Sequence, residues 1–381
     1  MGAYGKTVNF TQFQVGIENG EKPDEHFVSQ CLKDFSFTGF TSDMDEQTSG
    51  WVELDDYSET GFNRVKRDHL FAFAYRKDVR KIPASIMRMH VGKKEREFLR
   101  QNPTYSRVPK AQKGQIRDDI RAVLLPRALP NAAVIDVLWD QRTNILTAYS
   151  TSLSQLDDLA ALFRETFKDN FAISMIHPAA RGLSLMQEHE GLQEFKNLLS
   201  GDAVSTMISE NTWIGEEFLQ WLFARTMGEG TDFIACAEGP YPKGESFSAY
   251  IDNKVILSGE SNTGKQKVSI TGPQDIYSEI MEALRTGKDI EEATIFFEMH
   301  EDMWRMTLKG NTFQFASVKI PAIKIDNEHP DDERDSLLFE CSETLRAGVQ
   351  LFDSLFAQFL KIRTGKQWVF ERQEFLKKIA A

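Results

Sequence analysis

The sequence predicts an α+β protein with more than one lobe. Short runs of alternating apolar residues predict strands, and segments with an apolar residue every three or four positions predict helices, in mixed order along the chain. The chain has 381 residues, which is more than one ordinary hydrophobic core requires. Its 41% hydrophobic and 27% charged residues are typical of a globular protein and exclude a disordered one. We therefore expect antiparallel or mixed sheets covered by helices.

The first half of the chain predicts strands followed by one helix. Apolar residues alternate over residues 8–17, with one slip, and over residues 71–75, as expected of strands. Two further runs at 134–139 and 145–149 are separated by a short polar turn and predict a hairpin. A helix with a buried apolar stripe is expected to begin near Ser154.

A strongly basic segment lies between these strands. Residues 76–127 contain 15 Lys and Arg but only 5 Asp and Glu, a charge of +10, although the whole chain carries −12, so that the remainder carries −22. Pro83 marks the start of a predicted helix that Asn102 and Pro103 end, and a second helix is predicted from Gln115. The segment is thus predicted to be a pair of basic helices joined by a loop.

Positive charge concentrated in one segment favours the binding of a polyanion. A face that is merely solvated would normally mix both signs of charge, so the imbalance indicates a phosphate-binding surface. The acidic remainder would repel DNA elsewhere and confine it to this surface. The side chains that we expect to contact phosphates are Arg76, Lys77, Lys81, Arg88, Lys93, Lys94, Arg117 and Arg121.

The domain organisation follows from these patterns. An N-terminal lobe is interrupted by the basic helical tip, and a C-terminal lobe ends in a long amphipathic helix marked by Leu345 and Phe359. The bounds that we predict are 1–75 and 130–178 for the two parts of the N-terminal lobe, 76–129 for the basic insert and 179–381 for the C-terminal lobe.

Catalytic motifs are weak in this sequence. Residues 259–265 fit the start of a phosphate-binding loop, but Gln266 stands where Ser or Thr should hold magnesium, and residues 268–270 resemble a strand instead of a helix. We interpret this segment as a loop between two strands. Glu298, His300, Glu301 and Asp302 form a small group of potential metal ligands such as acidic chains produce by chance. We expect no catalytic residues, no metal and no cofactor.

The sequence shows neither a membrane-spanning helix nor a secretory signal. No apolar run approaches the ~18 residues of a membrane helix, and residues 1–11 do not resemble a secretory signal. The widely spaced cysteines, Cys31, Cys236 and Cys341, predict reduced thiols. We expect a cytoplasmic protein.

Short motifs in a particular order extend over roughly residues 1–178. They are Gly50-Trp51-Val52, Arg76-Lys77, Lys81-Ile82-Pro83, Leu124-Leu125-Pro126-Arg127-Ala128, and Trp139 with its hairpin and the helix from Ser154. Gln274-Asp275-Ile276 and the closing helix over residues 345–360 also fit. This order and spacing resemble the RdgC family of recombination-associated proteins, and Leu124 to Ala128 is the most specific part.

The resemblance implies a horseshoe-shaped subunit with a protruding basic helical tip, which dimerises into a ring around duplex DNA. Such a homodimer would bind DNA without sequence preference, restrain a RecA-type recombinase and associate with the nucleoid. Leu129 stands where the family carries an aromatic residue at the dimer gate, and Pro273, beside Gln274, stands where it carries a DNA-binding lysine. The resemblance therefore implies Leu129 as the gate residue and Gln274 as a polar contact to the DNA backbone.

Two other functions remain open at this point. Residues 298–302 could serve a metal-dependent exonuclease, a label that the family carries but that we find no residues to support. The basic segment could instead dock on an acidic partner, such as a recombinase. Double-stranded DNA is the expected partner, and the binding of single-stranded DNA is left open.

Overall fold

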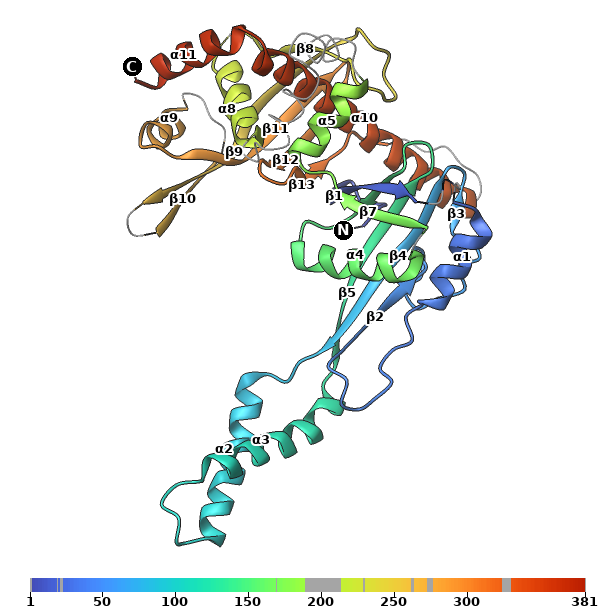
Figure 1. The fold of residues 1–381 in the computed structure, drawn as a ribbon, viewed down its shortest axis with the longest axis vertical. Coiled ribbons are helices and arrows are strands. Elements are labelled where there is room, and N and C mark those ends of the chain that lie inside the picture. Colours follow the sequence, from blue (N-terminus) through green and yellow to red (C-terminus); the bar gives the residue numbers. More distant parts are fainter. Residues whose placement is uncertain are drawn as a thin grey trace. The chain divides into compact units, whose positions relative to one another are not determined.

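The protein is described here by a computed structural model (Figure 1). It describes residues 2–18, 20, 23–168, 170–188, 214–228, 230–261, 264–272, 277–323 and 330–380. The named strands form antiparallel pairs, and helices accompany them, so the predicted α+β class is confirmed. The chain divides into two compact units, unit 1 with Met1–Gly16, Thr143–Asp157 and Ile173–Ala381, and unit 2 with Ile17–Arg142 and Asp158–Ala172. The finer division into lobes and a basic insert stays a prediction.

Unit 2 is built around the long strand β4. Its elements are α1 (Glu25–Asp34), β2 (Gln47–Val52), β3 (Lys66–Arg67), β4 (Leu70–Arg80), α2 (Ala84–Gln101), α3 (Lys110–Leu124), the 3-10 turn η1 (Leu125–Arg127), β5 (Pro130–Asp140) and the later part of α4 (Leu153–Phe167). β4 pairs with β2 and β3, and with β5 along its whole length, from Leu70 opposite Asp140 to Arg80 opposite Pro130.

Aromatic residues fill the core of unit 2. Trp139 on β5 makes an edge-to-face contact with Phe163 of α4 at 6.1 Å between ring centroids. The indole Nε1 of Trp51 on β2 donates a hydrogen bond of 2.7 Å to Oγ1 of Thr166. Because these side chains bury large apolar areas against α4, they fix the sheet from which the basic helices leave.

Unit 1 holds the remaining elements, except for the last residue of β1 and the first two residues of β7. They are β1 (Thr7–Ile17), β6 (Ile145–Ala148), β7 (Phe171–Met175), α5 (Pro178–Glu188), α8 (Ile214–Thr226), β8 (Asp232–Ile234), β9 (Ser246–Ser261), β10 (Gly264–Thr271), α9 (Ser278–Arg285), β11 (Asp289–Met299), β12 (Asp302–Lys309), β13 (Gln314–Lys319), α10 (Pro330–Thr364) and α11 (Gln367–Ala380). The strand order is β10-β9-β11-β12-β13-β1-β6, with β8 beside β9. Phe218 of α8 packs on Phe352 and Phe356 of α10, which places a phenylalanine-rich core between these helices.

Most strands and helices lie where the sequence places them. The predicted slip in the first strand lies between Phe10 and Phe13, where β1 changes its partner from β13 to β6. β9 continues as one strand although its pairing with β11 shifts near Asn253, a residue with a φ of 72°. β9 and β10 pair with each other, which confirms two strands here, but Gly259 and Lys265 lie within these strands, so the loop expected over residues 259–265 is shorter than predicted.

Candidate nucleic-acid interface

The basic helices form an insertion between two paired strands. β4 ends at Arg80, and its neighbour β5 begins at Pro130, opposite that residue. α2 begins after Pro83 and ends before Asn102, as predicted. Since proline lacks a backbone N–H and fixes its φ, it suits a helix start. α3 also follows a proline, Pro109, and therefore begins five residues before the predicted start at Gln115.

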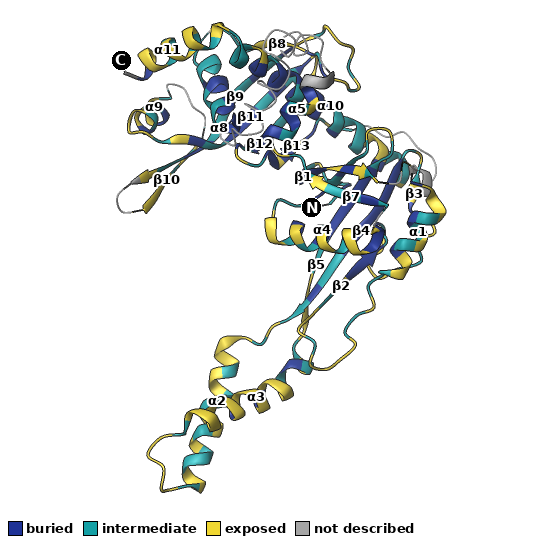
Figure 2. Ribbon diagram, viewed as in Figure 1, coloured by how far each residue is buried: buried dark blue, intermediate teal, exposed yellow. Residues whose placement is uncertain are grey.

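These two helices present most of their surface to solvent. None of the 18 residues of α2, all of which are described, is buried, and in α3 only Ile116 and Ile120 are. Figure 2 shows that α2 and α3 are mostly exposed. They pack on each other, and the rings of Phe98 and Tyr105 meet near their connection at 5.9 Å. The surface of this helical pair is thus available to a partner.

A groove of about 830 Å³ runs between the helices and the end of β4. On α3, Lys110, Lys113, Gly114, Arg117 and Arg121 line it, and their spacing of three or four residues places them on one helix face. We call this feature the cationic groove. Its charged lining consists of Arg80, Lys81, Arg88, Lys110, Lys113, Arg117 and Arg121, together with the carboxylates of Glu46 and Glu95.

Two of the seven cations are engaged by the two carboxylates. Nζ of Lys113 lies 2.8 Å from Oε1 of Glu95, and Arg121 forms an ion pair with Glu46. Arg80 stacks on the ring of Phe40, with 3.8 Å from its Cζ to the ring centroid.

The other four cations of the cationic groove have no carboxylate partner within the described part of the chain. They are Lys81, Arg88, Lys110 and Arg117. Positive charge in a concave surface attracts anions most strongly where no carboxylate neutralises it. These four side chains therefore contribute most to the positive electrostatic potential of the groove.

The predicted phosphate-contacting residues do not all converge. Lys81, Arg88, Arg117 and Arg121 line the cationic groove, whereas Arg76, Lys77, Lys93 and Lys94 are not among its lining residues.

Of these four, two on β4 are paired with carboxylates. Arg76 forms an ion pair of 2.8 Å with Asp78, and Lys77 forms one of 2.7 Å with Asp158. On α2, Lys94 pairs with Glu97 at 3.0 Å, and Lys93 is exposed. Arg76 and Lys77 on β4 are thus neutralised by carboxylates. The accessible positive charge lies after them in the sequence, at residues that line the cationic groove.

The structure describes one of the two residues that the resemblance implies. Leu129 lies two residues after η1 and is 90% exposed, so its side chain is available for contact with another molecule. Gln274, like Pro273, lies outside the described residues.

Sequence reasoning overlooked Arg80, Lys110 and Lys113 as lining residues. Lys110 and Lys113 were assigned to a loop because the apolar pattern begins only at Ile116. The signal that could have found them is the three- and four-residue spacing of cations from Lys110 to Arg121. Glu46 has no such signal, since it reaches Arg121 through the tertiary fold.

The carboxylates at residues 298–302 are engaged by neighbours. Glu298 accepts a 2.6 Å hydrogen bond from the hydroxyl of Tyr250, whose pKa is raised by burial and by this carboxylate. Burial, and then the nearby Asp302, raises the pKa of Tyr241 to about 12. His300 lies 3.6 Å from Glu245. Across the described residues, no three His, Cys, Asp or Glu side chains gather in a way that could hold a metal ion.

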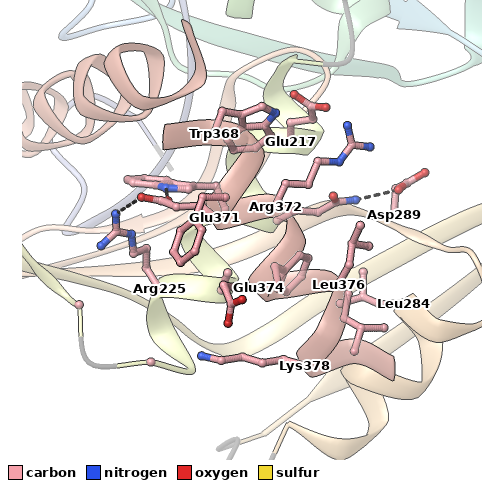
Figure 3. Close-up of a pocket in the computed structure, with 18 of the residues that line it drawn as sticks. Glu217, Arg225, Leu284, Asp289, Trp368, Glu371, Arg372, Glu374, Leu376 and Lys378 are labelled. Atoms are coloured by element: carbon pink, nitrogen blue, oxygen red, sulfur yellow. Dashed lines mark hydrogen bonds and ion pairs between the residues drawn. The ribbon is translucent and has the colours of Figure 1, made fainter. Parts of the chain in front are cut away.

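A second cavity lies in unit 1 between α8, α9 and α11 (Figure 3). Its volume is about 430 Å³. Glu371 accepts hydrogen bonds from Nε1 of Trp221 at 3.0 Å and from Nη2 of Arg225 at 2.8 Å. Gln220 donates to Asp289 at 2.7 Å. Four acidic and four basic side chains line this cavity, whereas the cationic groove has seven basic and two acidic ones, so the excess of positive charge lies in the groove.

The first half of the chain is similar to a known protein family. Residues 11–188 match the family model described as "RdgC: Putative exonuclease, RdgC", and this range contains the whole cationic groove. No curated protein matches the chain. Separately, no helix among the described residues is long and apolar enough to cross a membrane.

Proposed function

Since residues 11–188 belong to the RdgC family, we propose that this chain is a recombination-associated protein that binds DNA without sequence preference. The observation that carries the proposal is the convergence of Lys81, Arg88 and Arg117, with Lys110, on one exposed groove. Lysine and arginine bind phosphates whatever the base sequence, so contacts of this kind position DNA but do not read it.

A charge-reversal experiment tests this proposal. Arg88→Glu/Arg117→Glu replaces two unpaired cations of the cationic groove, and Lys6→Glu/Lys366→Glu makes the same change of charge at exposed residues of unit 1. Fluorescence anisotropy with duplexes of two unrelated sequences should show a large and equal loss of affinity for the first variant only. Equal binding by the two variants would show that the groove is not the DNA site.

We further propose that the chain forms a homodimer that encloses duplex DNA and restrains a RecA-type recombinase. The family resemblance supports this arrangement, as does Leu129, an apolar side chain 90% exposed at the end of the helical pair. Contact with a second copy would remove this side chain from water, which is favourable for an apolar group. A closed ring should remain on a covalently closed DNA circle at high salt and slide off a linear duplex of equal length.

We propose that the chain acts on DNA by binding and not by hydrolysis. Glu298 and Asp302 are both close to tyrosine hydroxyls, which supports a structural role for these carboxylates. An end-labelled duplex incubated with the protein and Mg²⁺ or Mn²⁺ should remain intact. Degradation that is lost in Glu298→Ala or Asp302→Ala would support an exonuclease instead. Salt-sensitive binding to an acidic protein, without DNA binding, would favour the docking-module alternative.

A further inference from the structure

Two glycines in the interior of the basic helices line the cationic groove. Gly92 is in α2 and Gly114 is in α3, and each is the only glycine of its helix. Glycine is the poorest helix former after proline, because it loses the most backbone entropy on folding. These two residues therefore weaken the helices that carry the groove, and their presence calls for a physical reason.

Close packing does not provide that reason. Elsewhere in the chain a Cβ atom on Gly50 would come within 2.5 Å of the backbone of Phe37, so that position needs glycine. A Cβ atom on Gly92 or Gly114 would meet nothing within 4 Å among the described residues. Both residues have ordinary helical backbones, so a left-handed φ does not demand glycine either.

Cations border each glycine on the groove face. Arg88 lies four residues before Gly92, and Lys110 and Arg117 lie four before and three after Gly114. Residues three or four apart are neighbours on a helix surface. Each glycine therefore leaves a hollow in which the helix backbone is accessible and positive side chains stand beside it.

We propose that Gly92 and Gly114 admit one sugar-phosphate strand of DNA to the floor of the cationic groove, an inference that rests on the proposed DNA binding. Without a Cβ atom, the helix backbone can be approached more closely. The groove of about 830 Å³ has the size of a ligand pocket and not of a duplex, so a single backbone enters it. From Lys110 to Arg121 the helix rises about 16 Å, which matches roughly five steps of one duplex strand.

Substitutions of graded size test the inference. Gly114→Ala and Gly92→Ala should raise the thermal stability of the protein and yet weaken DNA binding. Gly114→Leu should weaken binding at least about tenfold, as expected if one hydrogen bond to a charged group is lost. Gln112 lies two residues before Gly114, on the opposite face of α3. Gln112→Leu should therefore leave the affinity unchanged.

The series distinguishes two explanations for a loss of affinity: a side chain that fills the room needed by DNA, and a stiffer helix. Alanine and leucine both stiffen a helix relative to glycine, so equal losses of affinity at position 114 would overturn the inference in favour of flexibility. Affinity that does not change in any glycine variant would also overturn it, while the binding of DNA by the wild-type protein would leave the proposed function intact. A wild-type protein that fails to bind DNA would overturn both proposals. Circular dichroism of each variant confirms that it is folded.

Discussion

Glu95 offers a sharp test of the electrostatics of the cationic groove. Its carboxylate lines the groove and pairs with Lys113 at 2.8 Å. It therefore neutralises the charge of Lys113 and also repels an incoming phosphate. We predict that Glu95→Gln tightens DNA binding. The change is nearly isosteric and removes one negative charge, and because the lysine partner is exposed to solvent the ion pair contributes about 1 kcal/mol to folding.

The size of the effect follows from Coulomb's law. A phosphate at roughly 8 Å from the carboxylate is repelled by about 0.5 kcal/mol at the dielectric constant of water and by about 2 kcal/mol at an effective value near 20. Removing that repulsion should lower Kd by about two- to thirtyfold. Lys113 becomes available as one more phosphate contact, so the plot of log K against log salt should become steeper by about 0.9.

Glu97→Gln is the matched control. Glu97 lies on the same helix, pairs with Lys94 at 3.0 Å and does not line the cationic groove, yet its substitution changes the net charge equally. Fluorescence anisotropy with one duplex at four salt concentrations compares the two variants. If Glu95→Gln and Glu97→Gln gave the same Kd and the same salt slope, the carboxylate would not act through the groove and the reasoning would be refuted.

Further predictions concern the interface, the core and one tyrosine. Leu129→Asp should reduce the oligomeric state measured by light scattering without lowering the melting temperature, because Leu129 is 90% exposed; an unchanged oligomer would argue against a gate at this residue. Trp51→Phe should lower the free energy of unfolding in urea by about 1–3 kcal/mol, since the buried hydrogen bond to Thr166 is lost; a smaller loss would mean that water replaces it. Burial and Asp302 raise the pKa of Tyr241 to about 12 from 10.0. Because the folded state holds this proton more tightly, the tyrosine contributes stability below pH 10 that is lost between about pH 10 and 12. Urea unfolding at pH 9 and 11 should show a smaller loss with pH in Tyr241→Phe, and equal losses would contradict this assignment.

The ends of α2 were predictable because their signals are local. Pro83 can begin a helix but cannot continue one, and Asn102 precedes a proline that disfavours a helical residue before it. The start of α3 was missed because its first turns carry cations and no apolar stripe. There the helix is specified by Pro109 and by the fold around it, which periodicity alone does not report.

The sequence predicted which segment carries the candidate site, but not which of its side chains form the accessible surface. Asp78 lies two residues from Arg76 on the same strand face, so this pairing could have been anticipated. Lys77 meets Asp158, and Arg121 meets Glu46, only because distant segments come together. Charge counting therefore located the basic segment, whereas the choice between paired and unpaired cations required the tertiary structure.

The salt dependence of DNA binding examines the cationic groove most directly. Four unpaired cations, Lys81, Arg88, Lys110 and Arg117, should each neutralise one phosphate, so the wild-type slope of log K against log salt should be at least as steep as about −3.6. Replacing all four by glutamine should make the slope shallower by about that amount. A slope that is the same in the wild type and the fourfold variant would contradict the account, because the phosphates would then be neutralised elsewhere.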